Sequence, residues 1–193
     1  MRAGVLLPVF LLFSIPAQAE TRNGLLHKAE SALCGTTTLP PSGTTDVGFS
    51  PGNGALNVVL RVIGSAKREI RMATYSFTSK EIAQALVDAA KRGVDVRVVV
   101  DKSQLGERYT TATFLANQRV PVRVDSRHAI AHSKYLVADG MHVETGSFNY
   151  TDSAVKRNSE NAIALWNNPA MAKRYLANWA SHWEHAEPLA PRY

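Results

Sequence analysis

The sequence predicts an α/β fold, because strand-like and helix-like segments alternate along most of its length. Residues 70–77 are apolar and strand-like, residues 78–90 have helical character, and residues 94–101 place four valines on one strand face. A strand, a helix and a second strand in this order form a parallel pair with a right-handed crossover. The 193 residues are enough for one domain with a substantial core.

The first residues have the pattern of an export signal. Residues 1–19 combine Arg2, an apolar run too short to span a bilayer, and the small-x-small sequence Ala17-Gln-Ala19. Without Arg2 the net charge falls from +6 to +5, which favours an anionic partner, and no later segment is long enough to span a membrane. We therefore expect a cleaved signal peptide and a periplasmic or secreted protein.

Residues 20–51 are predicted to be an N-terminal extension that precedes a domain at residues 52–190. Only residues 25–33 of the extension have helical character, and residues 36–45 form a linker rich in Pro, Gly and Thr. Residues 55–67 then have apolar side chains at helical spacing and are expected to form the first core helix.

The helix at residues 78–90 is predicted to open at a capping box formed by Thr78 and Glu81 and to stop at Gly93. Residues 110–118 are expected to form a further helix, and residues 120–125 a further strand.

Arg119, Arg123 and Arg127 are predicted to lie on one face of this strand, opposite its valines. They form either a solvated charged face or a stripe that contacts phosphates. Phosphate contacts require only exposed bases and leave no sequence signature, so both interpretations stay open.

Short strands dominate the chain after residue 130. Residues 135–138 and 142–145 are predicted strands joined by a turn at Asp139-Gly140. Thr151 is expected to cap a short helix, and residues 162–166 to form the next strand. The final helix, at residues 169–184, has one apolar side that we interpret as core or dimer packing, formed by Met171, Tyr175, Trp179 and Trp183.

The sequence predicts no metal and no other cofactor. His128 and His132 are four residues apart, but the alternation around them is strand-like and no Glu or Asp completes a zinc set. Cys34 is the only cysteine, so it supplies neither a metal cluster nor an intrachain disulfide. The remaining histidines are interpreted as surface or packing residues: His27, His142, His182 and His185.

One stretch gathers most of the side chains that can do chemistry. His132 and Lys134 share a strand face because they are two residues apart, and Ser147 and Asn149 share a parity at the end of the next strand. An imidazole can act as a nucleophile or a general acid near neutral pH. Lys, Ser and Asn donors match the charge that develops on phosphoryl oxygens. The set therefore favours attack on a phosphorus atom.

The pattern His132-x-Lys134-x4-Asp139, followed by Gly146-Ser147-x-Asn149, resembles the signature of the phospholipase D superfamily. Together with Asn158-Ser-Glu-Asn161 it looks most like the small bacterial endonucleases of that superfamily, over roughly residues 53–183. The resemblance implies a mixed, largely parallel sheet sandwiched between helices and completed as a homodimer. It also implies that Asp139 is structural and holds the turn.

The same resemblance implies roles for the other residues. The motif histidine of the superfamily attacks phosphorus and forms a phosphohistidine intermediate, a role that falls on His132. Lys134 and Asn149 would hold the non-bridging oxygens, with Ser147 in support. Glu160 would bond the far ring nitrogen of His132 and fix its tautomer.

The implied mechanism needs two histidines, but the chain contains one His-x-Lys-x4-Asp sequence. The resemblance therefore implies a two-fold homodimer with a shared site to which each chain contributes one His132. One histidine must be neutral and the other protonated, so activity should be bell-shaped in pH. The paired lysines and asparagines would stabilise charge without a metal, so chelators should not inhibit.

We therefore expect a metal-independent, sequence-nonspecific endonuclease that hydrolyses DNA, with RNA as a second candidate substrate. One alternative is a phospholipase D-type lipid phosphodiesterase, which would need an apolar lipid-facing surface that the sequence does not indicate. The other alternative is a nucleic-acid-binding module that has lost turnover. The complete set of His, Lys, Ser, Asn and Glu argues against that module.

Overall fold

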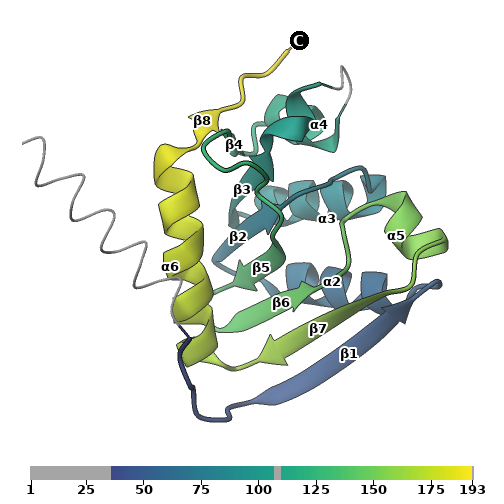
Figure 1. The fold of residues 1–193 in the computed structure, drawn as a ribbon, viewed down its shortest axis with the longest axis vertical. Helices are drawn as coiled ribbons and strands as arrows, with labels where there is room; N and C mark the ends of the chain where they lie inside the picture. Colours follow the sequence, from purple (N-terminus) through teal and green to yellow (C-terminus); the bar gives the residue numbers. More distant parts are fainter. Residues whose placement is uncertain (1–35, 107–109, 193) are drawn as a thin grey trace, which may run out of the picture. The chain divides into compact units, whose positions relative to one another are not determined.

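A mixed β-sheet forms the centre of the described chain, which comprises residues 36–106 and 110–192 of the computed structural model (Figure 1). The eight strands of this part of the chain lie in the spatial order β1-β7-β6-β5-β2-β3-β4-β8. The predicted signal peptide at residues 1–19, the predicted helix at residues 25–33 and Cys34 lie outside the described residues. In chain order the strands are β1 (Thr44–Ser50), β2 (Glu69–Thr74), β3 (Asp95–Asp101), β4 (Val122–Asp125), β5 (Lys134–Ala138), β6 (His142–Gly146), β7 (Glu160–Trp166) and β8 (Glu187–Pro188).

Antiparallel pairs dominate this sheet, which corrects the expectation of a largely parallel one. Only β2–β3 and β3–β4 are parallel, and each has a helical crossover, through α3 (Lys80–Lys91) and through η1 (Lys102–Leu105) with α4 (Thr111–Asn117). The other neighbouring pairs are antiparallel. A short turn joins β5 to β6, the segment with α5 (Asp152–Lys156) joins β6 to β7, and both edge strands run back along the sheet. The predicted mixed sheet between helices is confirmed.

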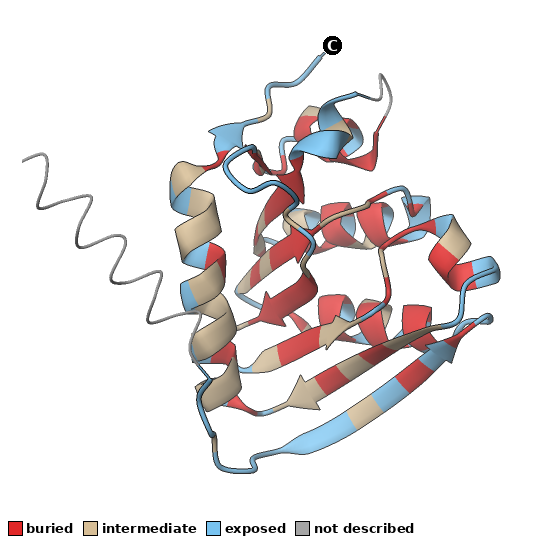
Figure 2. Cartoon of the chain, in the orientation of Figure 1, coloured by how far each residue is buried: buried red, intermediate tan, exposed pale blue. Residues whose placement is uncertain are grey.

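Helices cover both faces of the sheet. α2 (Gly54–Ser65) and α3 pack over the larger buried cluster, and α6 (Pro169–His185) packs over a smaller cluster on the other face (Figure 1). Figure 2 shows the buried positions on the strands and on the inward sides of these helices. Among the described helices, none combines the length and the apolar character needed to cross a bilayer.

The domain begins earlier in the chain than the sequence predicted. Residues 44–50 are not part of a linker or an extension but form edge strand β1, which pairs antiparallel with β7 along its whole length. Their local sequence, Thr-Thr-Asp-Val-Gly-Phe-Ser, is a weak strand signal, and pairing with β7 overrides it. The compact unit extends from Thr37 to Tyr193.

The cap of α3 also differs from the prediction by one residue. Ser79, not Thr78, is the N-cap, and its hydroxyl accepts a hydrogen bond from the backbone N–H of Ile82. Thr78 instead donates its backbone N–H to the carbonyl of Tyr150 at 3.0 Å. Ser79 makes a similar bond to the same carbonyl, so the start of α3 is tied to the segment after β6.

The apolar side of α6 packs against the sheet, as the core interpretation predicted. Trp179 is buried, stacks on Trp183 at 4.8 Å between ring centroids, and donates its indole N–H to the carbonyl of Met72 at 2.9 Å. Tyr135 of β5 donates its hydroxyl to Asn178 of α6 at 2.7 Å. These bonds satisfy the polar ends of aromatic side chains that are otherwise buried.

A carboxyl group lies fully buried on the other face, next to the motif. Glu144 of β6 is 0% exposed, and the hydroxyl of Tyr150 donates to its Oε2 at 2.6 Å. Its Oε1 has no hydrogen-bond partner within the described residues. Burial raises the pKa of Glu144 to about 8, and the Tyr150 hydrogen bond only partly opposes this. The folded chain therefore holds Glu144 as a neutral acid at neutral pH.

We expect Glu144 to make stability depend on pH. Its folded pKa is about 8, above the unfolded value of about 4.3. The contribution of protonated Glu144 to the free energy of unfolding is therefore complete below the unfolded pKa and is lost as pH rises through the folded pKa. Glu144→Gln keeps the group neutral. The free energy of unfolding of wild type should therefore fall between pH 5 and pH 8 relative to that of this variant.

Urea unfolding at several pH values measures this difference. Glu81→Gln, an exposed substitution on α3, is the matched control and should show no such trend. A difference between Glu144→Gln and wild type that stays constant from pH 5 to pH 8 contradicts the assignment.

Candidate active site

The motif residues meet at one end of the sheet. β5 is antiparallel to both β2 and β6, and β6 is antiparallel to β7. The start of β5 therefore lies beside the end of β2, the end of β6 and, one strand further, the start of β7. This arrangement brings together residues 132–134, 147–149 and 158–161, as the sequence pattern predicted.

His132 lies exposed just before β5, where its ring faces Tyr75 at 4.6 Å between ring centroids. Tyr75 comes directly after β2, and its backbone N–H bonds the carbonyl of Ser133 at 3.0 Å. Sequence reasoning missed Tyr75, because only the β2–β5 pairing brings it to the histidine. The tyrosine ring restricts the orientation of an otherwise solvent-facing imidazole.

Lys134 is the buried counterpart of His132. Its side chain runs from the first position of β5, and its ammonium donates to the carbonyl of His132 at 2.7 Å and lies 5.3 Å from the Tyr75 ring centroid. Burial lowers the pKa of Lys134, and the charge of Glu160 partly opposes that shift. A cation held in such a low-dielectric position attracts an anion more strongly than a solvated lysine does.

Glu160 organises the polar residues on the adjacent strand ends. The hydroxyl of Ser147 donates to its Oε2 at 2.6 Å, and the amide of Asn158 donates to its Oε1 at 2.9 Å. Ser147 also accepts from the backbone N–H of Asn161 at 3.1 Å. The expected bond between Glu160 and His132 is not formed in the described chain, where the carboxylate bonds Ser147 and Asn158 instead.

Asn149 is held by the segment on either side of it. Phe148 and Tyr150 are fully buried, so the chain between them has little freedom. The Oδ1 atom of Asn149 is buried and has no hydrogen bond within the described residues. Gly146 permits the close approach of β7 here, because a Cβ at that position would overlap the carbonyl oxygen of Asn161. This explains the glycine of the Gly-Ser-x-Asn pattern.

Asp139 has the structural role that the motif implied, and its contacts reach further than the turn. Its carboxylate accepts the backbone N–H groups of Lys67, Arg68 and Glu69 at 2.9, 2.8 and 3.0 Å. Asp139 and Gly140 both have positive φ, at 55° and 70°, as the hairpin turn requires. The carboxylate therefore ties the β5–β6 turn to the segment that enters β2.

The loop before His132 is fixed by residues at the ends of the parallel strands. Asp101, the buried last residue of β3, accepts the backbone N–H of Ala131 at 2.7 Å. Lys102 donates to the carbonyl of His128 at 3.0 Å. Asp101 was not among the predicted site residues, because its role depends on a contact with a loop 30 residues away.

The predicted arginine stripe is not formed. Arg123 is engaged with α6, where it donates to the carbonyl of Trp183 at 2.6 Å and its guanidinium lies 4.5 Å from the Trp183 ring centroid. Arg119 has a φ of 63° in the turn after α4, and Arg127 follows the end of β4. Neither belongs to the strand, so the three side chains do not share a strand face.

Sequence reasoning also missed a second polar group at this end of the sheet. Asp125, His128, His182 and His185 have potential ligand atoms within 4.8 Å of one another. Two expectations are therefore wrong: an acid, Asp125, does lie beside His128, and His182 and His185 do lie beside other potential metal ligands. The sequence contained one signal, the i, i+3 spacing within each of the pairs Asp125/His128 and His182/His185. The two pairs come together only because α6 packs beside β4.

The comparisons with known proteins support one family. The model of the cardiolipin synthase, PLD-like domain matches residues 59–183. A solved structure of a phospholipase D family member, Nuc from Salmonella typhimurium, is 42% identical with a TM-score of 0.74, over 76% of this chain and 98% of that one.

Two curated relatives extend this result. The phospholipase D of Rickettsia bellii is 36% identical over 133 residues, which are 69% of this chain and 66% of that protein. The mitochondrial cardiolipin hydrolase of Xenopus laevis is 31% identical over 144 residues, or 75% of this chain and 65% of that protein. The chain thus spans a little under two thirds of the length of these relatives.

We expect Asp139→Asn to lower the free energy of unfolding at pH 7 by about 1–3 kcal/mol, because an amide oxygen replaces a carboxylate that accepts three backbone bonds. Burial would raise the pKa of Asp139, but the backbone N–H groups of Glu69, Lys67 and Arg68 lower it overall. Its contribution is therefore present above the unfolded pKa of about 3.9 and is lost as pH falls through the folded pKa.

Chemical denaturation at pH 7 and at successively lower pH measures the effect. The deficit of Asp139→Asn relative to wild type should shrink in acid. Asp88→Asn, on the exposed side of α3, is the matched control and should stay within about 0.5 kcal/mol of wild type. An Asp139→Asn deficit that persists unchanged below pH 3 would show that its carboxylate charge is not the cause.

Proposed function

Because the chain belongs to the phospholipase D-like family, we propose that it is a hydrolase of phosphodiester bonds and that its substrate is nucleic acid. One observation carries the proposal: the exposed imidazole of His132 stands beside the buried ammonium of Lys134, at the sheet end that also holds Ser147, Asn149 and Glu160. A nucleophile, a fixed cation and polar donors at one place suit displacement at phosphorus.

The reaction that this site supports has two steps. His132 attacks the phosphorus, the bond to the leaving oxygen breaks, and that oxygen takes a proton from a second histidine. Water then attacks the phosphorus, the second histidine takes the proton that the water loses, and the bond to His132 breaks to regenerate its free imidazole. Lys134 and Asn149 would bind the non-bridging oxygens. Glu160 would orient Ser147 and Asn158, which it bonds, and its charge would favour the protonated form of Lys134.

The second histidine that the reaction needs would come from a partner subunit in a homodimer. The sequence has one His-x-Lys-x4-Asp motif, and His132 is exposed rather than enclosed by its own chain. A two-fold axis close to His132 would place His132 of the partner subunit opposite it and complete one shared site. Activity would then be bell-shaped in pH, since one imidazole must be neutral while the other is protonated.

Nucleic acid is the favoured substrate for three reasons. The motif resembles that of the small bacterial endonucleases, the mature chain would have a net charge of +5, and a polyanionic substrate matches that charge. No described element resembles a base-reading helix, so cleavage would show little sequence preference. With its signal sequence, the protein would act in the periplasm or outside the cell.

A lipid phosphodiester is the second candidate, and one observation favours it. Ile130 is 58% exposed two residues before His132, so the site has an apolar neighbour that the sequence did not indicate. Relatives are named phospholipase D and cardiolipin hydrolase. A lipid enzyme would need more such surface around the site to enter a membrane interface.

Cleavage of plasmid DNA in excess EDTA tests the main proposal. Wild type should nick and degrade the DNA, and His132→Ala should lower the rate by at least about 10³-fold, because the nucleophile is lost. His142→Ala changes a histidine at the opposite end of β6 and should remain active. Circular dichroism in the same buffer checks that each variant stays folded.

The remaining outcomes separate the alternatives. DNA binding by His132→Ala with no cleavage supports the catalytic role, whereas full cleavage by that variant removes His132 from the mechanism. If wild type binds DNA without cleaving DNA or RNA, the chain is a binding module. If wild type leaves nucleic acid intact but hydrolyses phosphatidylcholine or cardiolipin vesicles, the lipid candidate replaces the nuclease.

Mixing experiments test the shared site. Wild type and His132→Ala chains are refolded together in equal amounts so that subunits exchange. If one site needs both His132 residues, only wild-type homodimers are active, and activity per wild-type chain should fall by about half. The same mixture with His142→Ala should show no fall. Activity that stays proportional to the wild-type chain concentration contradicts the shared site.

A further inference from the structure

Four residues form a compact group at the end of β4, which we name the Asp125 cluster: Asp125, His128, His182 and His185. Asp125 is the last residue of β4, and His128 follows it in the loop that leads to His132. His182 and His185 lie one helical turn apart near the end of α6. His132 and Lys134 are not members, so the cluster is separate from the candidate active site.

Three imidazole nitrogens converge on one carboxylate oxygen. Asp125 Oδ2 lies 2.7 Å from Nδ1 of His182, 2.9 Å from Nδ1 of His128 and 3.3 Å from Nε2 of His185. Asp125 is 0% exposed, and the side chains of His182 and His185 are only 14% and 15% exposed. Three imidazole rings are thus gathered around a single buried oxygen.

Hydrogen bonding alone accounts poorly for this arrangement. A carboxylate oxygen has two lone pairs, which the imidazoles of His128 and His182 already occupy. The other oxygen, Oδ1, accepts the backbone N–H of Arg127 at 3.0 Å and that of His128 at 3.3 Å. The Nε2 atom of His185 is buried and makes no hydrogen bond within the described residues.

The geometry points to a zinc site: we propose that the Asp125 cluster binds one Zn²⁺ through three imidazole nitrogens and one carboxylate oxygen. Three histidines and one aspartate supply four nitrogen and oxygen ligands of the types that Zn²⁺ binds in tetrahedral geometry. Ligand atoms around a tetrahedral Zn²⁺ are separated by about 3.3 Å at bond lengths of about 2.0 Å. The separations of 2.7 to 3.3 Å around Oδ2 approach that value.

The residues around the ligands prepare them for a cation. The two backbone N–H groups on Oδ1 fix the carboxylate plane and leave Oδ2 directed at the imidazoles. Carboxylates that bind a metal are usually held in this way by hydrogen bonds from surrounding groups.

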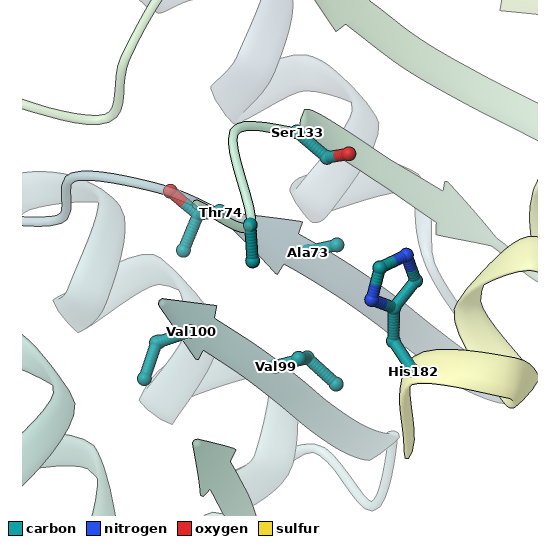
Figure 3. Close-up of a pocket in the computed structure, with 7 residues that line it drawn as sticks. Ala73, Thr74, Val99, Val100, Ser133 and His182 are labelled. Carbon is teal, nitrogen blue, oxygen red and sulfur yellow. The ribbon is translucent and has the colours of Figure 1, made fainter. Parts of the chain in front are cut away.

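Zinc at this position would be structural and would act on the candidate active site through the loop. It would join the end of α6 to the end of β4 and to His128, four residues before His132. His182 also lines a small pocket with Ala131 and Ser133, which flank His132, and Figure 3 shows the side chains of His182 and Ser133 at this pocket. The metal would therefore add one more tie to a loop that Asp101 and Lys102 already fix, and it would not touch the substrate.

Metal content gives the most direct test. The full-length protein, exported and purified, is incubated with ZnSO₄, dialysed against metal-free buffer and measured by plasma mass spectrometry. Wild type should retain about one zinc per chain, and zinc should raise its melting temperature by at least about 4 °C. With Co²⁺ in place of zinc, visible absorption of the intensity typical of tetrahedral coordination should appear.

Three variants locate the site. His185→Ala and His128→Gln should each reduce retained zinc at least about tenfold and remove the melting-temperature gain. His142→Ala, outside the cluster, should retain zinc as wild type does. The side chain of His128 is 45% exposed, so His128→Gln is the variant expected to fold even if the buried histidine cannot be replaced.

Two results would overturn the proposal. Wild type that retains less than about 0.1 zinc per chain and melts at the same temperature with and without zinc shows that the cluster is a hydrogen-bonded group only. Zinc retained in full by both His185→Ala and His128→Gln shows that the metal binds elsewhere. DNA cleavage is not used as a readout, so these outcomes do not depend on the proposed nuclease activity.

Discussion

The register of β5 between β2 and β6 is the constraint on which the site depends. Lys134 pairs with Thr74 of β2, and Tyr135 pairs with Thr145 of β6. Because successive strand residues point to opposite faces, a slip of one residue would exchange Lys134 with Tyr135, which packs under α6. The Asp139 carboxylate opposes such a slip, since it fixes the hairpin turn to the segment before β2.

The same register collects polar groups at one end of an otherwise apolar sheet. Lys134, Asp101 and Asp125 are all buried at strand ends, where burial of a charge is costly unless hydrogen bonds compensate it. Asp101 and Asp125 accept backbone N–H groups from the loops that follow, and Lys134 donates to the carbonyl of His132. The strand ends thus fix the loops, and the loops present His132 to solvent.

Local sequence patterns predicted most of the elements but failed where pairing overrides propensity. The helices at 55–67, 78–90, 110–118 and 169–184 correspond to α2, α3, α4 and α6 with small shifts at their ends. Strand β1 was missed because its polar residues give no strand pattern without β7 beside them. The largely parallel sheet that the resemblance implied is not formed, because the strands that carry the motif pair antiparallel with their neighbours.

Local sequence spacing was enough to predict which side chains gather at one end of the sheet, because spacing within one or two strands sets which residues share an end. His132, Lys134, Ser147 and Asn149 were placed together in this way, and the role of Asp139 came from the family resemblance. The partner that each group bonds depends on the tertiary structure. Glu160 bonds Ser147 rather than His132, Arg123 bonds α6, and His182 and His185 meet Asp125. These contacts join residues 13 to 60 positions apart, and their geometry depends on how α6 and the strands pack, which no local pattern encodes.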